Sequence, residues 1–397
     1  MVKLGLQVVK YLQQGNIVRQ TTAEIGVKSQ VRQERYFCSC IAYVGSEKQR
    51  AMKRKVTLIP GDGIGPEIVA SVKSVFRALE VPIEWEEENA GLSTLKAHGE
   101  ILPRSLLDSL ERNRIGIKGP ITTPVGEGFR SVNIQLRQHF ELYANIRPCK
   151  SIDAIPTRFK DVDLVIIREN TEGLYSGLEY CDERLGIVDS ICRITKKGCE
   201  RIVRAGFEYA RTNQRKKVTL VHKANILKEA GATLLKAGKT ISREYPEIAM
   251  EDLIIDNMCM QLVTRPERYD VIITTNLFGD ILSDLSAGLV GGLGVAAGAN
   301  IGSDIAIFEA VHGSAPDIAG KGLANPTAIL KSGVMMLRQM DEGQLAARLE
   351  RAIAFTLQNK EQCTADLGGK AGRKEFTDHI IRNLEHDRVR VETSTSY

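Results

Sequence analysis

The sequence has no CxxC cysteine pair and no long run of apolar residues. Its eight cysteines are scattered without a CxxC pair, which argues against a structural zinc site or a disulfide framework and favours free thiols in a reducing compartment. The longest stretch without a charged residue, Leu285 to Ser303, contains six glycines, which is more typical of looped backbone than of a membrane span. We therefore expect no membrane partner.

The chain also lacks an excess of either charge once its first residues are set aside. Residues 1–51 contain eight Lys or Arg and three Glu, so residues 52–397, with 46 basic and 46 acidic side chains, are balanced. A balanced body gives no reason to propose nucleic acid as a partner. Residues 1–51 are interpreted as an untranslated or disordered leader before a working start at Met52, which places the protein in the cytoplasm. The alternative is a transit peptide, which places it in the mitochondrial matrix.

Strand-like apolar runs alternate with longer amphipathic segments from Lys55 onward. This alternation predicts an α/β protein with a largely parallel sheet, followed after Pro326 by helices that end near Glu385. Sites in such sheets gather at the carboxyl ends of strands, so polar residues that end strands are natural site candidates. These residues are Lys118, Arg168, Lys223, Asp256 and Asn276.

The glycine-rich segments are weak signals by themselves, because none of them has the spacing GxGxxG. Residues 59–67, with the sequence IPGDGIGPE, follow a predicted strand and precede a predicted helix. Such a segment either cradles a nucleotide or forms a tight turn without a ligand, and the sequence leaves both readings open.

A cluster of basic and polar residues lies in the middle of the chain. Asn133 and Arg137 are four residues apart and would share one face of a helix, and Ser131, Arg147 and Arg168 lie nearby in the sequence. Three arginines close to Ser and Asn suit a substrate with several carboxylates, because a guanidinium group binds a carboxylate through two hydrogen bonds. The alternative is solvated surface charge.

Three aspartates are candidate metal ligands. Asp280 and Asp284 are four residues apart on one face of a predicted helix, where a cation between them relieves their repulsion, and Asp256 ends a strand. A site with only oxygen ligands favours Mg²⁺ or Mn²⁺ over Zn²⁺, although a plain helix cap at Asp280 explains the pair as well. Tyr175 and Lys223 are candidates for proton transfer, since a lysine at the end of an apolar strand is partly desolvated.

Eight motifs, in this order along the chain, resemble those of the β-decarboxylating dehydrogenases, and most closely the NAD-dependent isocitrate dehydrogenases. The resemblance covers residues 53–385. The motifs are IPGDGIGPE, KGPITTP, SVNIQLR, YANIRP, IRENTEGLYSGLE, VHKANILK, NLFGDILSDLSAGLVGGLG and FEAVHGSAPDIAGKGLANP.

The resemblance implies the isocitrate/isopropylmalate dehydrogenase-like α/β fold rather than a Rossmann domain. It implies a large domain made from residues 52–142 and 291–388, a small domain made from residues 143–290, and a tail at 389–397. Within the small domain, residues 173–195 would form a clasp that dimerises. The implied assembly is a homodimer or higher homo-oligomer whose active sites are shared between subunits.

The resemblance also implies a role for each candidate residue. Tyr175 and the second subunit's Lys223 would transfer protons, and Asp280, Asp284 and the second subunit's Asp256 would hold Mg²⁺ or Mn²⁺. The residues implied to bind isocitrate are Thr122, Ser131, Asn133, Arg137, Arg147 and Arg168. The residues implied to surround NAD are Lys118, Glu309, His312, Gly313, Asp317, Ile318 and Asn325.

Two alternatives to an isocitrate dehydrogenase of this kind follow from the same resemblance. A sister enzyme would act on 3-isopropylmalate or homoisocitrate, but Ser131 and Asn133 suit a polar γ-carboxylate better than an apolar substituent. A non-catalytic regulatory subunit would keep the fold, but such subunits tend to lose catalytic residues, and this chain retains Tyr175, Lys223 and the aspartates.

Overall fold

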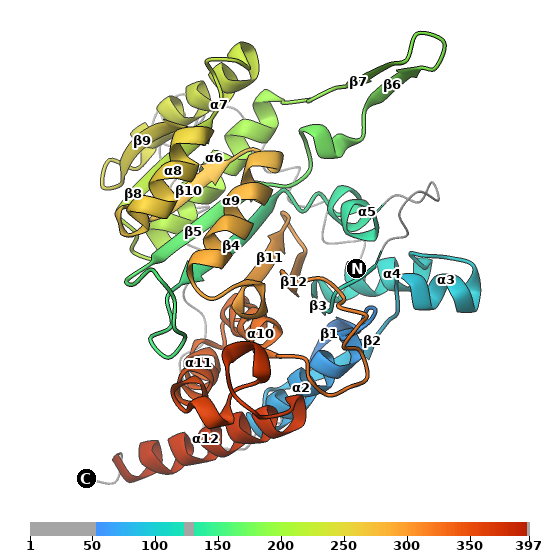
Figure 1. Ribbon diagram of the computed structural model, residues 1–397, viewed down its shortest axis with the longest axis vertical. Helices are drawn as coiled ribbons and strands as arrows, with labels where there is room; N and C mark the ends of the chain where they lie inside the picture. The colour runs from blue at the N-terminus through green and yellow to red at the C-terminus, as the bar shows by residue number, and fades with distance from the viewer. Residues whose placement is uncertain (1–52, 123–130, 395–397) are drawn as a thin grey trace, which may run out of the picture. The chain divides into compact units, whose positions relative to one another are not determined.

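The computed structural model describes residues 53–122 and 131–394, with side chains up to residue 386, so the predicted leader at 1–51 lies outside the described residues. A ten-stranded mixed sheet runs through the described body (Figure 1). Its strands, in spatial order, are β2 (Ile83–Glu87), β1 (Arg54–Ile59), β3 (Ile115–Lys118), β12 (Ala306–Ala310), β11 (Ala297–Ile301), β4 (Ala144–Lys150), β5 (Asp163–Glu169), β10 (Val271–Thr274), β8 (Lys217–His222) and β9 (Ala249–Ile254).

The sheet consists of two parallel groups joined by antiparallel strands. Strands β2, β1, β3 and β12 are parallel to one another, and so are β5, β10, β8 and β9. Between the groups, β11 is antiparallel to both β12 and β4, and β4 is antiparallel to β5. The two groups therefore run in opposite directions. The carboxyl ends of the predicted strands therefore lie at two opposite edges of the sheet. In a fully parallel sheet they would all lie at one edge.

Strands β5, β10 and β8 of the second group are mostly apolar because helices cover both of their faces. On β5, Val165 and Ile167 pack toward helices α6 (Lys196–Thr212) and α7 (Lys228–Ile241). The alternate residues Leu164 and Ile166 pack toward α8 (Ile255–Thr264) and α9 (Asn276–Leu289). Arg168 continues this second set, so the alternation of a strand directs its side chain toward α9.

Helices also cover both faces of the first group. Helices α2, α10, α11 and α12 pack on one face, and α4 and α5 pack on the other. The division into a large and a small domain stays a prediction. The bounds are α2 (Gly65–Ala78), α3 (Leu92–His98), α4 (Arg104–Asn113), α5 (Val132–His139), α10 (Thr327–Gln339), α11 (Gly343–Gln358) and α12 (Arg373–Ser394).

Single-turn 3₁₀ helices complete the described elements, and the last helix is longer than predicted. Helix α12 continues to Ser394 instead of ending near Glu385, so it includes part of the predicted tail. Within the described residues, no helix is both long and apolar enough to cross a membrane. The 3₁₀ helices are η1 (Leu174–Ser176), η2 (Ser242–Glu244), η3 (Pro266–Arg268), η4 (Leu293–Val295), η5 (Lys360–Gln362) and η6 (Ala365–Leu367).

Strands β6 (Glu179–Asp182) and β7 (Ile187–Ser190) form a separate antiparallel hairpin that projects from the body (Figure 1). This hairpin lies within the segment predicted to be a dimerising clasp. A two-stranded hairpin is marginally stable without a covering layer. Several large apolar side chains on or beside it are nevertheless exposed, namely Leu174, Tyr180, Leu185, Ile187, Val188 and Ile191.

Candidate active site

Two buried arginines lie side by side where the central strands meet α9. Arg147 comes from β4, and its Nη1 donates to Ser283 Oγ and, over 3.2 Å, to Asp284 Oδ1. Arg168 comes from β5, is 1% exposed, and donates through Nη1 to Asp280 Oδ1. Neighbouring strands thus present two guanidinium groups to the same face of one helix.

Arg137 from helix α5 brings a third guanidinium group close to these two. Burial lowers the pKa of Arg147, and the positive charge of Arg137 lowers it further. Burial and then Arg137 likewise lower the pKa of Arg168, to about 10. The three predicted substrate arginines therefore come together as a mutually repelling cationic cluster, rather than as separate solvated surface charges.

The first turns of α9 are shaped to hold Arg168. Asn276 Oδ1 accepts from Arg168 Nε over 3.0 Å and from Nη2 over 2.7 Å, while Asn276 Nδ2 donates to the carbonyl of Glu172 over 2.9 Å. Gly279 leaves room for the stem of the arginine, because a Cβ added there would lie 2.5 Å from Arg168 Cγ. The strand-end candidate Asn276 thus orients Arg168.

Tyr175 and Asp280 meet at the open end of this arginine cluster. The phenol of Tyr175, on η1, donates to Asp280 Oδ2, and the ring centroid lies 5.0 Å from Arg168 Cζ. Burial raises the pKa of Tyr175, and its bond to Asp280 raises it further. Burial alone would raise the pKa of Asp280, but Arg168, the Tyr175 hydroxyl and Arg147 outweigh it and lower that pKa. Tyr175 is therefore a proton donor beside an ionised carboxylate.

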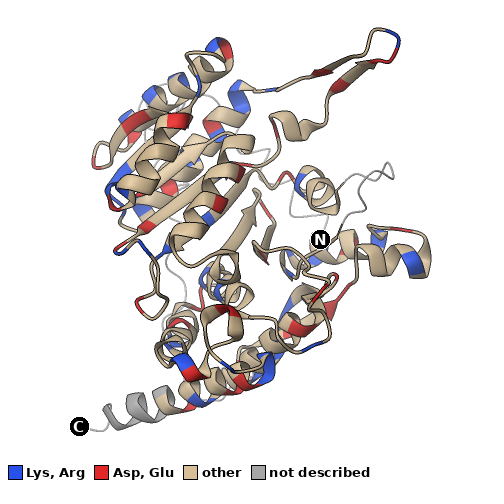
Figure 2. Ribbon diagram, viewed as in Figure 1, with Lys and Arg blue, Asp and Glu red and all other residues tan. Residues whose placement is uncertain are grey.

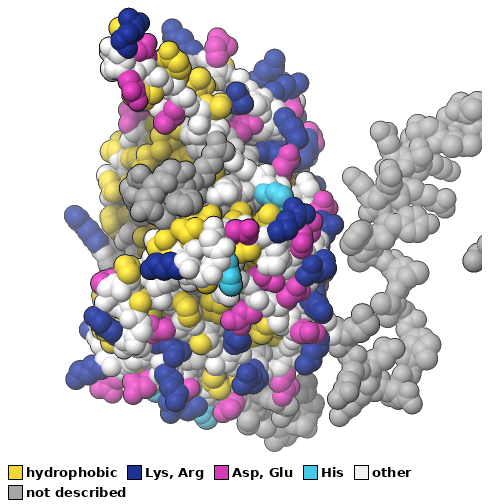
Figure 3. Space-filling view, turned by 90° about the vertical axis from the view of Figure 1, so that its right-hand side faces the viewer, with side chains coloured by type: hydrophobic (Ala, Val, Ile, Leu, Met, Phe, Trp, Pro, Cys, Tyr) yellow, Lys and Arg dark blue, Asp and Glu magenta, His cyan; other side chains and the backbone are white. Residues whose placement is uncertain are grey.

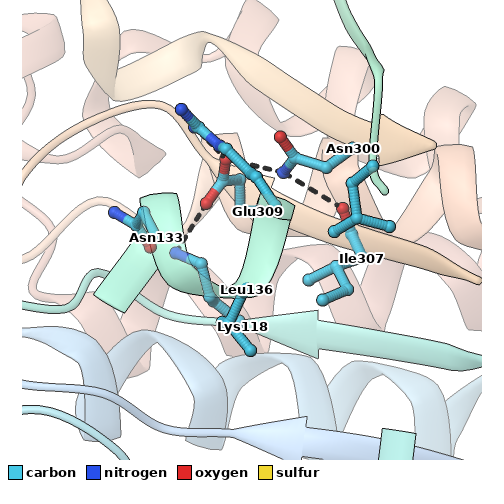
Figure 4. A pocket seen from close by; sticks show the side chains of 8 residues that line it. Lys118, Asn133, Leu136, Asn300, Ile307 and Glu309 are labelled. Carbon is cyan, nitrogen blue, oxygen red and sulfur yellow. Dashed lines mark hydrogen bonds and ion pairs between the residues drawn. The ribbon is translucent and has the colours of Figure 1, made fainter. Parts of the chain in front are cut away.

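Arg137 also lines a small pocket together with Lys118, Asn133 and Glu309 (Figure 4). The buried carboxylate of Glu309 accepts from Lys118 Nζ and Arg137 Nη2. Burial would raise the pKa of Glu309, but Lys118 and Arg137 lower it overall. Asn133 also lines the pocket, and its Oδ1 is buried without a partner among the described residues. The pocket therefore keeps one free acceptor.

The segment between β12 and α10 contains the other residues predicted to contact a dinucleotide. His312 Nδ1 lies 3.0 Å from the carbonyl of Gly313, and burial lowers the pKa of His312. Asn325 is bonded to Asp366 over 2.9 Å. Asp317 is exposed, and Ile318 packs beside the core. The carboxylate of Asp317 makes no hydrogen bond or ion pair with another described residue.

The glycine-rich segment at 59–67 supports this loop. Ile64 N–H donates to the carbonyl of Ser314 over 2.9 Å, and Thr122 Oγ1 bonds to Ser314 Oγ over 2.6 Å. Gly63 has a φ of +58°, and an added Cβ would lie 2.0 Å from the Ser314 carbonyl oxygen. Glu67 accepts from the backbone of Gly320 and Gly322. The glycines therefore allow two backbone segments to pack closely.

Lys223 and Asp256 lie apart from the arginine cluster. Lys223 Nζ donates to Asp256 Oδ1 over 2.9 Å, and neither side chain bonds to Arg147, Arg168, Tyr175 or Asp280. Among the described residues, no group of three or more His, Cys, Asp or Glu side chains could hold a metal ion. One chain thus presents the predicted ligands as two separate sets.

The comparison with protein families identifies the chain. Residues 55–382 match the model of the isocitrate/isopropylmalate dehydrogenase family. This chain belongs to that family. The match confirms the family and the fold class predicted from the sequence, including the departure from a Rossmann domain.

Proteins that resemble the chain include relatives named as catalytic subunits and relatives named as regulatory subunits. It is 50% identical to catalytic subunit 5 of the mitochondrial NAD isocitrate dehydrogenase of Arabidopsis thaliana, with 83% of this chain and 88% of that one covered. It is 49% identical to a regulatory subunit of the mitochondrial NAD isocitrate dehydrogenase of Dictyostelium discoideum, with 83% and 92% covered. The crystal structure of isocitrate dehydrogenase from Methylococcus capsulatus matches with a TM-score of 0.81 and 51% identity, covering 83% and 99%.

The residues of this family member fit a metal and a dinucleotide. The carboxylates of Asp280 and Asp284 are the oxygen ligands that Mg²⁺ and Mn²⁺ prefer. Buried polar atoms without a partner among the described residues also surround the site, and in native proteins such atoms call for a ligand or water. They include Asn133 Oδ1, Arg147 Nε and His312 Nε2.

Four residues of the site were not named as candidates from the sequence. Ser283 accepts from Arg147, and Asn145, Asn170 and Asn300 form a buried group beside Glu309. Ser283 lies three residues after Asp280 on the same helix face, so helical periodicity could have found it. Asn145 and Asn170 lie within the motifs YANIRP and IRENTEGLYSGLE, but their contact with Asn300 depends on the pairing of β11 with β4, which no local pattern encodes.

Proposed function

We propose that this chain catalyses the metal-dependent oxidative decarboxylation of isocitrate to 2-oxoglutarate and CO₂, with reduction of NAD. The observation that carries the proposal is the convergence of Arg137 with the buried Arg147 and Arg168, because the positive charge of Arg137 lowers the pKa of both. A substrate with three carboxylates relieves their mutual repulsion. The family and the relatives named as NAD isocitrate dehydrogenases support the same activity.

Substrate binding is assigned to residues on both sides of the arginine cluster. Arg147 and Arg168 would hold the carboxylates nearest the reacting carbon, since Asp280 and Asp284 lie beside them. Ser131 and Asn133, at the start of α5, would bind the γ-carboxylate, and Asn133 lines the pocket next to Arg137. A polar pair there disfavours the apolar substituent of 3-isopropylmalate.

The metal would be held by Asp280 and Asp284 of one chain, together with Asp256 of a second chain. When bound, Mg²⁺ or Mn²⁺ supplies Lewis-acid polarisation of the substrate's oxygen atoms. The carboxylate of Asp280 is ionised and already oriented by Arg168 and Tyr175. Asp284 Oδ1 accepts from Arg147, so a metal bound by the two aspartates of α9 would compete with these hydrogen bonds.

Proton transfer is assigned to Lys223 and Tyr175. Lys223 of a second chain would take the proton of the C2 hydroxyl as hydride leaves C2 for NAD, the electron acceptor. The β-carboxylate then leaves as CO₂, and its bonding electrons remain on the substrate as an enolate, which becomes the enol when its oxygen takes back the proton held by Lys223. Tyr175 would protonate the enol carbon, a role that suits a phenol whose pKa is raised by burial and by Asp280. The product is 2-oxoglutarate.

NAD binding is assigned to the pocket of Glu309 and to the loop that follows it. Lys118, Glu309 and His312 would lie near the nicotinamide end, and Gly313 and Asn325 would line the rest of the site. Asp317 and Ile318 would face the adenosine ribose. A free carboxylate accepts a hydrogen bond from the 2′-hydroxyl of NAD and repels the 2′-phosphate of NADP.

The assembly is inferred to involve at least two chains. Exposed apolar side chains lie on the clasp and also beside the metal ligands, such as Ile281 next to Asp280, and Met260 and Val263 on the helix of Asp256. Figure 3 shows exposed hydrophobic side chains on the upper part of one face. A homodimer is our first proposal. The names of relatives as catalytic and regulatory subunits favour a hetero-oligomer as the alternative.

The role of the chain within such an assembly is inferred to be catalytic. The relative from Dictyostelium discoideum is named a regulatory subunit, so identity alone does not separate the two roles. The chain retains Tyr175, Lys223 and the three aspartates. The mitochondrial names of the relatives favour targeting to the mitochondrial matrix over the cytoplasmic location expected from the sequence.

A steady-state assay of the purified full chain tests the function directly. We expect reduction of NAD with isocitrate and Mg²⁺, and little rate with 3-isopropylmalate or homoisocitrate. Tyr175→Phe should slow the reaction while leaving binding of isocitrate nearly unchanged. A chain that folds and binds isocitrate but never turns over by itself would identify a regulatory subunit instead.

A further inference from the structure

A row of polar side chains crosses the middle of the sheet on one face. Lys118 on β3 pairs in register with Glu309 on β12, and Asn300 on β11 pairs with Asn145 on β4. Asn145 in turn pairs with Arg168 on β5. Residues directly opposite on neighbouring strands point to the same face, so the row links the Glu309 pocket to a substrate arginine.

Asn300 is the central member of this row. Its Nδ2 donates to Glu309 Oε1 over 2.7 Å and lies 3.4 Å from the carbonyl of Ile307. Its Oδ1 accepts from Asn145 Nδ2 and from Asn170 Nδ2, each over 2.9 Å. The side chain is only 2% exposed, and Figure 4 shows it reaching toward Glu309. All of its hydrogen-bonding capacity is therefore used inside the protein.

The surroundings of Asn300 argue for a specific role. Asn145 and Asn170 are buried at 0% and 4% exposure, and the Oδ1 atom of each has no partner among the described residues. A buried polar atom without a partner costs stability, whereas apolar residues would fill the centre of a sheet without this cost. The group thus stabilises the fold less than an apolar replacement would.

We infer that Asn300 is a positioning residue, which fixes the carboxylate of Glu309 for NAD and joins it to the strands of the substrate arginines. The inference rests on the proposed function, because it takes Glu309 to contact the dinucleotide. Lys118 bonds to Oε2 of Glu309, whereas Arg137 and Asn300 both donate to Oε1, and Asn300 is the closer of these two donors, at 2.7 Å against 3.3 Å. Loss of Asn300 leaves the charge of Glu309 in place but lets its orientation change.

Two substitutions of Asn300 separate positioning from packing. Asn300→Asp has the same shape and still accepts from Asn145 and Asn170, but its ionised form replaces the donor to Glu309 with a carboxylate that repels it. Asn300→Ala removes every bond. Both should raise KM for NAD by about 10-fold or more, the usual effect of losing a hydrogen bond to a charged group. KM for isocitrate should stay near the parent value, since Arg147 and Arg168 keep their own partners.

A buried polar residue far from the pocket provides the matched control. Thr356 on α11 is 0% exposed, accepts from Asn383 Nδ2 over 2.8 Å and donates to the Ala352 carbonyl over 2.8 Å. Thr356→Val should lower the melting temperature without changing KM for NAD. If Asn300 were merely structural, its variants would behave like Thr356→Val.

The measurements are kcat, KM for each substrate and the melting temperature, together with calorimetric titration of NAD. An unchanged KM for NAD in Asn300→Asp overturns the inference, as does an equal rise in both KM values. A parent chain without activity on isocitrate and NAD rejects the proposed function instead. The NAD titration then still reports whether Asn300 affects dinucleotide binding.

Discussion

The arginine cluster and the Lys223–Asp256 pair differ in burial and in the hydrogen-bond and ion-pair partners that one chain provides. Arg168 is 1% exposed and has partners on two sides, in Asn276 and Asp280. Lys223 and Asp256 have side-chain exposures of 25% and 70%, and each serves as the other's ion-pair partner. The first region is built by the fold, whereas the second presents reactive groups outward. We propose on this basis that the second pair acts on a substrate held in a neighbouring subunit.

Removal of the metal should have the largest effect and should affect both regions alike. EDTA should abolish activity, and Mg²⁺ or Mn²⁺ should restore it. Asp280→Asn and Asp256→Asn should each lower kcat by about 10³-fold, because Lewis-acid stabilisation is worth several kcal/mol. Only Asp280→Asn should also change the melting temperature, since Asp280 is bonded to Arg168. Full turnover in metal-free buffer would show that the aspartates have another role.

The choice between NAD and NADP tests Asp317, an exposed residue whose carboxylate has no partner among the described residues. NAD should be preferred over NADP by at least ~10²-fold in kcat/KM, because Asp317 repels the 2′-phosphate and Ile318 offers it no donor. Asp317→Lys combined with Ile318→Tyr should reduce this preference sharply. Because Asp317 is exposed, the melting temperature should change little. Equal use of both cofactors by the parent would remove Asp317 from the site.

A substitution of Glu309 tests a buried carboxylate that has hydrogen-bond and ion-pair partners within the chain. Glu309→Gln should lower stability by about 3–5 kcal/mol at neutral pH, the usual cost of leaving buried charges without their partner. Lys118 and Arg137 keep the pKa of Glu309 below its ordinary value of 4.5. The stability that Glu309 contributes is therefore present above pH 4.5 and is lost as the pH falls below it.

Melting curves of the parent and of Glu309→Gln should accordingly differ most at neutral pH and converge in acid. The matched comparison is Glu244→Gln, because Glu244 is an exposed member of an ion pair with Arg204. Exposed pairs contribute little, so that variant should stay close to the parent at every pH. A constant difference between the parent and Glu309→Gln down to strongly acidic pH would contradict the assigned ionisation.

Truncation should have the smallest effect. A chain that begins at Met52 should fold and turn over like the full chain, because the strands of the described body pack among themselves from β1 onward. The comparison is kcat and melting temperature with and without residues 1–51. A loss of soluble protein would show that the leader packs on the body.

Local sequence patterns predicted some of the strands and the first set of site residues. Asp256 and Asn276, which were expected to end strands, lie instead in helices α8 and α9. Apolar runs marked β5, β8 and β10, and the four-residue spacing of Asp280 and Asp284 placed both on one face of α9. From charge and spacing alone, the arginines could be either solvated surface charges or substrate-binding residues. The structure excludes solvated surface charge for two of them, because Arg147 and Arg168 are buried on adjacent strands.

Non-local pairing explains what the sequence did not predict. The reversal of direction at β11, β4 and β5 depends on the order of strands in space, which no short pattern encodes. The same pairing joins Asn145 and Asn300, which are 155 residues apart. Charge was more predictable, since Figure 2 shows acidic and basic residues interspersed, in agreement with the balanced composition.

Mixing two inactive variants tests most directly whether the two regions come from different subunits. Asp280→Asn removes the arginine-cluster half of a site, and Lys223→Met removes the other half, with an expected loss of roughly 10²–10⁴-fold in kcat. A hybrid dimer of the two would contain one doubly altered site and one intact site. Joint refolding or co-expression should therefore restore roughly a quarter of the parent activity. Isolated hybrids without restored activity would mean that Lys223 acts within its own chain.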